Sequence, residues 1–181
     1  FGRDGYTLPG EEKRLRNYLT QAQVEKLKEL LVDNTSGNMY NTLQWFLFQC
    51  ETGMRYSDLE VFSAKLIRAN TIYFADVKTA TPHAIPLNPR IEKLLPIIYT
   101  LPLPKYENYK RHLQAAGMAI KLPFKLTSHV GRHTFAVQWL EDGGDIYKLQ
   151  AILGHSDLKM TMIYAKITPK GLRDEMKRIR G

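Results

Sequence analysis

Residues 127–164, TSHVGRHTFAVQWLEDGGDIYKLQAILGHSDLKMTMIY, carry the strongest pattern in the chain. Helix signals predict one helix over 127–140, stopped by two glycines, and a second over 145–153, stopped by Gly154. His155 follows at once, and Tyr164 comes nine positions later. Tyr164 could be an ordinary core aromatic, or it could be the residue that makes a covalent bond.

The chain before this stretch predicts helices with one interruption. Thr20 and Gln23 form a capping box that opens a helix, and an apolar segment over 38–52 predicts a central helix. Short β-branched and aromatic runs within 64–87 predict two or three antiparallel strands, and further helices are expected after residue 88. The expected fold is therefore mainly α with a small antiparallel β-sheet (α+β).

Composition narrows the class of partner. The 181 residues are enough for one domain with a real core, and 26 Lys+Arg against 18 Asp+Glu give a net charge of +8. This surplus favours nucleic acid over acidic membranes. A lone cysteine, Cys50, excludes an internal disulfide, and no apolar run reaches the length of a membrane span. The single cysteine fits a reducing compartment.

Cationic and proton-donating residues recur in a suggestive order. A helix over 127–140 would place His129 and Arg132, three residues apart, on a single face. A zinc site at His129 and His133 is disfavoured, because Val130 stands where the zincin motif has glutamate and no cysteine cluster completes a site. No carboxylate cluster for Mg²⁺ is present either. The candidate catalytic residues are Arg55, Lys78, His129, Arg132, His155 and Tyr164.

These residue types fit chemistry at a phosphodiester. An arginine fork can bridge two nonbridging oxygens, and a tyrosine can form a stable phosphodiester to the protein. Without a metal ion, side chains must neutralise the charge that develops on the phosphate in the transition state.

The local contexts resemble the catalytic domain of the tyrosine recombinases, the phage integrase family. The segments that carry the resemblance are TGMRYSDL, DVKTA, HVGRHTFA and LGHSDLKMTMIY. One departure is Gly131, where the family usually has an aliphatic residue; it is expected to lose some helix propensity and one packing contact. Lys65 lies on the same expected sheet as Lys78. Lys78 is preferred as the catalytic lysine because it is at the end of a strand, beside a turn.

The resemblance implies a role for each residue. Tyr164 would attack the phosphodiester to form a 3′-phosphotyrosine, while Arg55, Arg132 and His155 contact nonbridging oxygens. His129 would act as acid/base or as a further phosphate contact, and Lys78 would protonate the leaving 5′-oxygen. Asp58 is expected to orient neighbouring groups. No metal or other cofactor is required.

The resemblance also implies an organisation beyond the single domain. Residues 1–19 are expected to link to a missing N-terminal DNA-binding domain, and residues 20–181 to form the catalytic domain with a terminal helix over 169–180. Double-stranded DNA is the expected partner, with a monomer in isolation and a tetramer on paired sites. The resemblance also implies a cytoplasmic, DNA-associated protein of a prokaryote. The apolar stripe of the terminal helix could dock in cis or on a neighbouring protomer.

Three alternatives remain from the residues alone. A type IB topoisomerase uses similar chemistry, a silent DNA-binding module would explain the charge, and a phosphatase or nuclease would need another nucleophile. Geometry adds one expectation. A straight helix from Ser156 to Tyr164 would separate its ends by about 12 Å, so a break is expected near 159–161, with Thr161 capping a short second helix.

Overall fold

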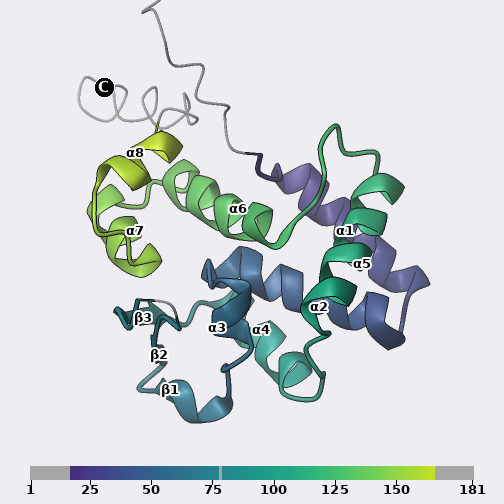
Figure 1. The fold of residues 1–181 in the computed structure, drawn as a ribbon, viewed down its shortest axis with the longest axis horizontal. Coiled ribbons are helices and arrows are strands. Elements are labelled where there is room, and N and C mark those ends of the chain that lie inside the picture. The colour runs from purple at the N-terminus through teal and green to yellow at the C-terminus, as the bar shows by residue number, and fades with distance from the viewer. Residues whose placement is uncertain (1–16, 78, 166–181) are drawn as a thin grey trace, which may run out of the picture.

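The computed structural model describes residues 17–77 and 79–165. Within them the chain forms a mainly helical domain with one small sheet (Figure 1). The elements, in order, are α1 (Gln21–Asp33), α2 (Gly37–Thr52), α3 (Tyr56–Leu59), η1 (Ala64–Leu66), β1 (Ile67–Arg68), β2 (Thr71–Ala75), β3 (Pro82–Pro86), α4 (Pro89–Ile98), α5 (Tyr106–Ala119), α6 (Ser128–Glu141), α7 (Ile146–Leu153) and α8 (Lys159–Ala165). The fold class expected from the sequence is confirmed.

Local sequence signals set most element boundaries. The capping box at Thr20 and Gln23 is formed in both directions, and Asn88 caps α4 by accepting hydrogen bonds from two backbone amides. Three strands pair in the antiparallel order β1-β2-β3, with Ile72 opposite Ile85 in the register of β2 and β3. Both of these isoleucines are buried, so one face of the hairpin packs on the core.

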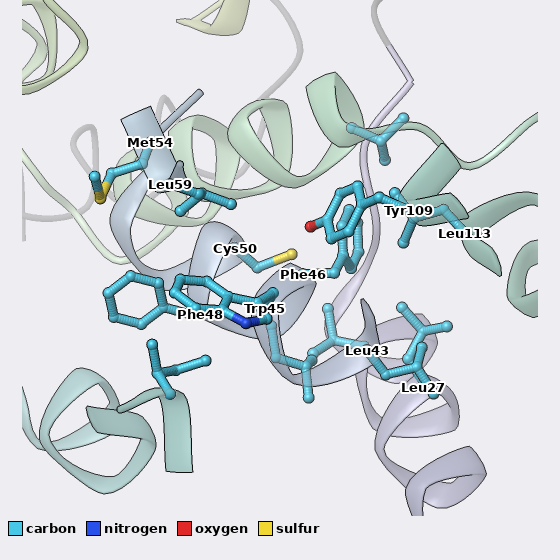
Figure 2. Packing of buried hydrophobic residues seen from close by; sticks show 14 of the residues in the cluster. Leu27, Leu43, Trp45, Phe46, Phe48, Cys50, Met54, Leu59, Tyr109 and Leu113 are labelled. Carbon is cyan, nitrogen blue, oxygen red and sulfur yellow. The ribbon is translucent and has the colours of Figure 1, made fainter. Parts of the chain in front are cut away.

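The core is organised around α2, which is buried on nearly every side. It packs against α1, α4, α5 and α6, and its aromatic side chains fill the centre of the domain (Figure 2). Trp45 and Phe48 meet edge to face at 6.0 Å, while the Tyr109 hydroxyl donates to Gln49 Oε1 at 3.2 Å. Cys50 lies inside this cluster, and burial raises the pKa of its thiol well above the ordinary value.

A smaller second cluster joins α6, α7 and α8. Its fully buried members include Leu149, Leu153 and Tyr164. Leu19 is fully buried as well, and its backbone amide donates to the Thr134 hydroxyl at 2.9 Å. Tyr18 and Leu19 therefore already pack on the domain, ahead of the boundary expected at residue 20. The expected terminal helix over 169–180 lies outside the described residues.

None of the helices in the described ranges is long and apolar enough to cross a membrane.

Gly131 lies on α6 against α2. A Cβ built there would stand 3.0 Å from the Phe46 ring and 3.2 Å from Oε1 of Gln49. An aliphatic side chain at this position would therefore require Phe46 and Gln49 to shift by a few tenths of an ångström.

Gly131→Leu should consequently lower the free energy of unfolding by about 1–3 kcal/mol, the usual cost of overpacking a core. Urea denaturation monitored by circular dichroism measures this loss. Ala151→Leu adds the same side chain at an exposed position of α7 and should change stability by less than about 0.5 kcal/mol. Equal effects of the two substitutions would contradict the packing argument.

Candidate active site

Arg132 joins two loops that are distant in sequence. The residue is buried on α6, and its Nη1 donates to the carbonyl of Gly53 at 2.7 Å while its Nη2 donates to the carbonyl of Leu153. These carbonyls end α2 and α7, where the helix dipoles favour a cation. The guanidinium thereby brings the loop that precedes Arg55 next to the one that carries His155.

Arg55 is held by two acidic residues. Its side chain forms an ion pair with the buried carboxylate of Asp76, at the end of the hairpin. Its backbone amide donates to Asp58 Oδ2 at 2.9 Å, and Asp58 Oδ1 accepts from Val77 N at 3.4 Å. Asp58 is fully buried, so it fixes the start of α3 relative to the β2–β3 turn.

Asp76 also shapes the turn that contains Lys78. Its Oδ1 accepts from Thr79 N at 3.0 Å, and its backbone carbonyl accepts from Ala80 N at 2.8 Å. Lys78 itself lies outside the described residues. Lys65 lies in η1 and is exposed, so the expectation that it belongs to the sheet is wrong.

His83 ties the sheet to α7. Its ring stacks on Phe74 with centroids 4.7 Å apart, and its Nδ1 lies 2.9 Å from the carbonyl of Ile152. Gly154 has φ +60°, and a Cβ built on it would lie 2.3 Å from His83 Cε1. Glycine is required there by both backbone conformation and space, so the turn ahead of His155 sits directly on the sheet.

Burial lowers the pKa of His83 below its ordinary value of 6.5, although the Ile152 carbonyl opposes this shift. The unfolded chain then binds a proton more readily than the folded one, so stability should fall as the pH drops through about 6.5. Thermal melts of the wild type and His83→Gln between pH 5.5 and 8 test this. The variant should lose part of the acid sensitivity, and an unchanged pH dependence would contradict the assignment.

His155 and Tyr164 pack together beside α6. Their rings stack with an interplanar angle of 10° and centroids 6.5 Å apart, and both side chains are buried. His155 Nδ1 lies 2.9 Å from the Thr161 hydroxyl. His133 Nδ1 lies 2.8 Å from the Tyr164 hydroxyl, a contact that the sequence analysis missed.

The segment between His155 and Tyr164 is broken, as expected, but the break comes earlier. Residues 154–158 are not helical, α8 begins at Lys159, and Asp157 accepts from the Lys159 amide at 2.8 Å. Thr161 is inside α8 rather than at its cap. The earlier turn lets α8 fold back, so the two rings meet despite their separation in sequence.

His129 completes the set of described candidates. It is exposed in the first turn of α6, and its ring lies 6.3 Å from that of His133 between centroids. In the described part of the chain, no three histidine, cysteine, aspartate or glutamate side chains are grouped so that they could hold a metal ion. Arg132, on α6, thus joins the loops that lead to Arg55 and His155, and Tyr164 is stacked on His155.

Comparison with solved structures shows that this chain has the fold of tyrosine recombinase catalytic domains. The catalytic domain of bacteriophage HP1 integrase matches with a TM-score of 0.66 and 24% identity, covering 89% of this chain and 94% of that domain. The XerA recombinase matches with a TM-score of 0.71 and 22% identity, covering 93% and 66%.

Sequence comparison relates the chain to the phage integrase family. The pattern of that family matches residues 104–170. The integrase of Escherichia phage P2 is 29% identical over 167 residues, which cover 91% of this chain and 47% of the phage protein. The integrase of Escherichia phage 186 is 34% identical over 128 residues, covering 70% and 38%. The chain spans less than half the length of these relatives.

Proposed function

We propose that the chain is the catalytic domain of a site-specific DNA recombinase that integrates or excises a mobile element through a 3′-phosphotyrosine intermediate. The observation that carries the proposal is the meeting of the Arg55 loop, the His155 loop and the tyrosine helix around Arg132. The net charge of +8 suits a DNA partner.

The proposed reaction begins when the Tyr164 oxygen attacks the scissile phosphorus and the bond to the 5′-oxygen breaks. Arg55 and Arg132 hold nonbridging oxygens, as guanidinium forks do for phosphate, and His155 donates a further hydrogen bond. Lys78 protonates the leaving oxygen. His129, exposed at the start of α6, contacts the phosphate or exchanges a proton. Reversal onto another 5′-hydroxyl rejoins the strand without ATP.

The acidic residues act indirectly in this scheme. Asp58 and Asp76 fix Arg55 and the turn around residue 78, so that the guanidinium and the lysine approach the phosphate together. Tyr164 is fully buried, so its attack requires that the residues over its hydroxyl open when DNA binds. Neither a metal ion nor another cofactor takes part.

Incubation with a nicked suicide substrate tests the function. Such a duplex, carrying the recombination site of the element, loses the strand that would reverse the reaction, so the phosphotyrosyl adduct accumulates. The expected result is a protein–DNA species that survives denaturing electrophoresis. Binding of this substrate without an adduct would favour a silent DNA-binding module. In a separate assay on supercoiled DNA, relaxation without strand exchange between two sites would favour a type IB topoisomerase.

DNA binding should depend steeply on salt. Lysine and arginine contacts to phosphates release counterions, so log K should fall with log salt concentration at about −0.9 per phosphate neutralised. Fluorescence anisotropy at several potassium chloride concentrations measures the slope. A slope near zero would show that phosphate contacts do not dominate the affinity.

Beyond the single chain, we propose a linker from an N-terminal DNA-binding domain and a tetramer as the active assembly on paired sites. The linker is shortened from residues 1–19 to residues 1–17, because Tyr18 and Leu19 pack on the domain. The apolar stripe of residues 169–180 would dock either in cis or on a neighbouring protomer. The XerH and Tn1549 integrase structures that match this fold are complexes with DNA, which supports the choice of partner.

A further inference from the structure

His133 is a histidine of α6 that has no role in the proposed reaction. It follows Arg132 directly, and its Nδ1 lies 2.8 Å from the hydroxyl of Tyr164. The two rings are 5.6 Å apart between centroids, at an interplanar angle of 47°. An edge nitrogen of the imidazole thus meets the oxygen that would become the nucleophile.

The surroundings restrict where that hydroxyl can point. Tyr164 is fully buried, and its ring is stacked on His155 from the side of α7. His155 Nδ1 is engaged with the Thr161 hydroxyl, which lies on the same helix as Tyr164. His133 is therefore a titratable nitrogen within hydrogen-bond distance of the tyrosine oxygen, held there by the packing of α8 on α6.

A phenol is a weak nucleophile until its proton is removed, and a general base must lie within hydrogen-bond reach of that proton. We propose that His133 is a catalytic residue that positions the Tyr164 hydroxyl and accepts its proton during strand cleavage. This inference rests on the proposed recombinase function.

Nδ1 of His133, with the ring hydrogen on Nε2, takes the phenolic proton as the Tyr164 oxygen forms its bond to phosphorus. The bond from phosphorus to the 5′-oxygen breaks, and that oxygen takes a proton from the acid assigned to Lys78. In the rejoining step the proton on His133 returns to the departing tyrosine oxygen.

His133→Gln tests this role, because glutamine retains polarity and approximate size but cannot accept a proton at neutral pH. Adduct formation on the suicide substrate should slow by about 100-fold, within the range for lost general-base catalysis. The matched control is His112→Gln. His112 is a half-buried histidine on α5, a helix that lies away from α8 (Figure 1). Its Nδ1 lies 3.4 Å from the Thr42 hydroxyl. The control should cleave at the wild-type rate.

A second measurement separates proton transfer from mere positioning. Fluorine acidifies the phenol, so replacing Tyr164 by 3,5-difluorotyrosine reduces the need for a base. The fluorinated residue should speed His133→Gln by about 10-fold and change the wild type by less than about threefold. The cleavage rate with difluorotyrosine is compared with the rate of the same variant that carries ordinary tyrosine. A folding defect shared by these two forms therefore cancels. His133→Asn provides the same comparison if the glutamine variant is unstable.

The outcomes are distinct. Cleavage by His133→Gln at the wild-type rate would overturn the proposal, and so would an equal effect of fluorination in the variant and the wild type. If the wild type forms no adduct, the recombinase function fails and this proposal fails with it. A slow glutamine variant that fluorination selectively restores supports the role of His133.

Discussion

Tyr164→Phe should abolish the covalent protein–DNA adduct while leaving DNA affinity within about twofold of the wild type. The substitution removes only the oxygen that bonds to phosphorus. The ring stays in the second core cluster, stacked on His155, so the fold is kept. The lost hydrogen bond to His133 should lower the free energy of unfolding by about 0.5–1.5 kcal/mol. Denaturing electrophoresis after incubation with the suicide substrate measures the adduct.

Tyr147→Phe is the matched control. Tyr147 lies on α7 with 66% of its surface exposed, so its hydroxyl is the more accessible of the two. The control should form the adduct at the wild-type rate. An adduct that persists in Tyr164→Phe and disappears in Tyr147→Phe would reassign the nucleophile to Tyr147.

Lys78→Ala should slow cleavage of ordinary DNA by about 10²–10⁴-fold, the range for lost acid catalysis. A 5′-bridging phosphorothiolate at the cleavage site should restore most of this loss, because a thiolate leaves readily without a proton. Single-turnover cleavage of matched oxygen and sulfur substrates measures the recovery. This pair of substrates tests the proton donor rather than the overall requirement for the residue.

Arg55→Ala and Arg132→Ala are the comparison variants, and sulfur should not rescue them, because their proposed contacts are to nonbridging oxygens that stay unchanged. Arg132→Ala should also lose stability, since the carbonyls of Gly53 and Leu153 lose their buried partner. Rescue of Lys65→Ala by the sulfur substrate would identify Lys65, in η1, as the proton donor. Rescue of neither lysine variant would point to His129 or His155.

Local pattern predicted the elements of this fold well, for reasons that reside in neighbouring residues. The capping box of Thr20, the cap at Asn88 and the left-handed glycines 53 and 154 act within one turn of chain. The break before the tyrosine helix also followed from helix geometry. Its position was missed by a few residues, because Thr161 was taken for a cap and in fact contacts His155 from within α8.

The candidate site was named in part from sequence because the types and order of its residues suit phosphate chemistry. Asp76 was missed, although an aspartate two residues before Lys78 at a strand end is a recognisable turn former. His133 was considered only as a zinc ligand. Its spacing from His129 was visible, but its contact with Tyr164 depends on how α8 packs on α6.

The sequence by itself determined the helices, the hairpin and the inventory of cationic and nucleophilic side chains, since these depend on local periodicity and composition. Tertiary structure alone decided which of them meet. Arg132 reaches two helix ends that lie 79 and 21 residues away, Gly131 lies tightly against Phe46 and Gln49 of α2, and His133 meets Tyr164 across 31 residues. Such contacts arise from the packing of whole helices, which no short stretch of sequence specifies.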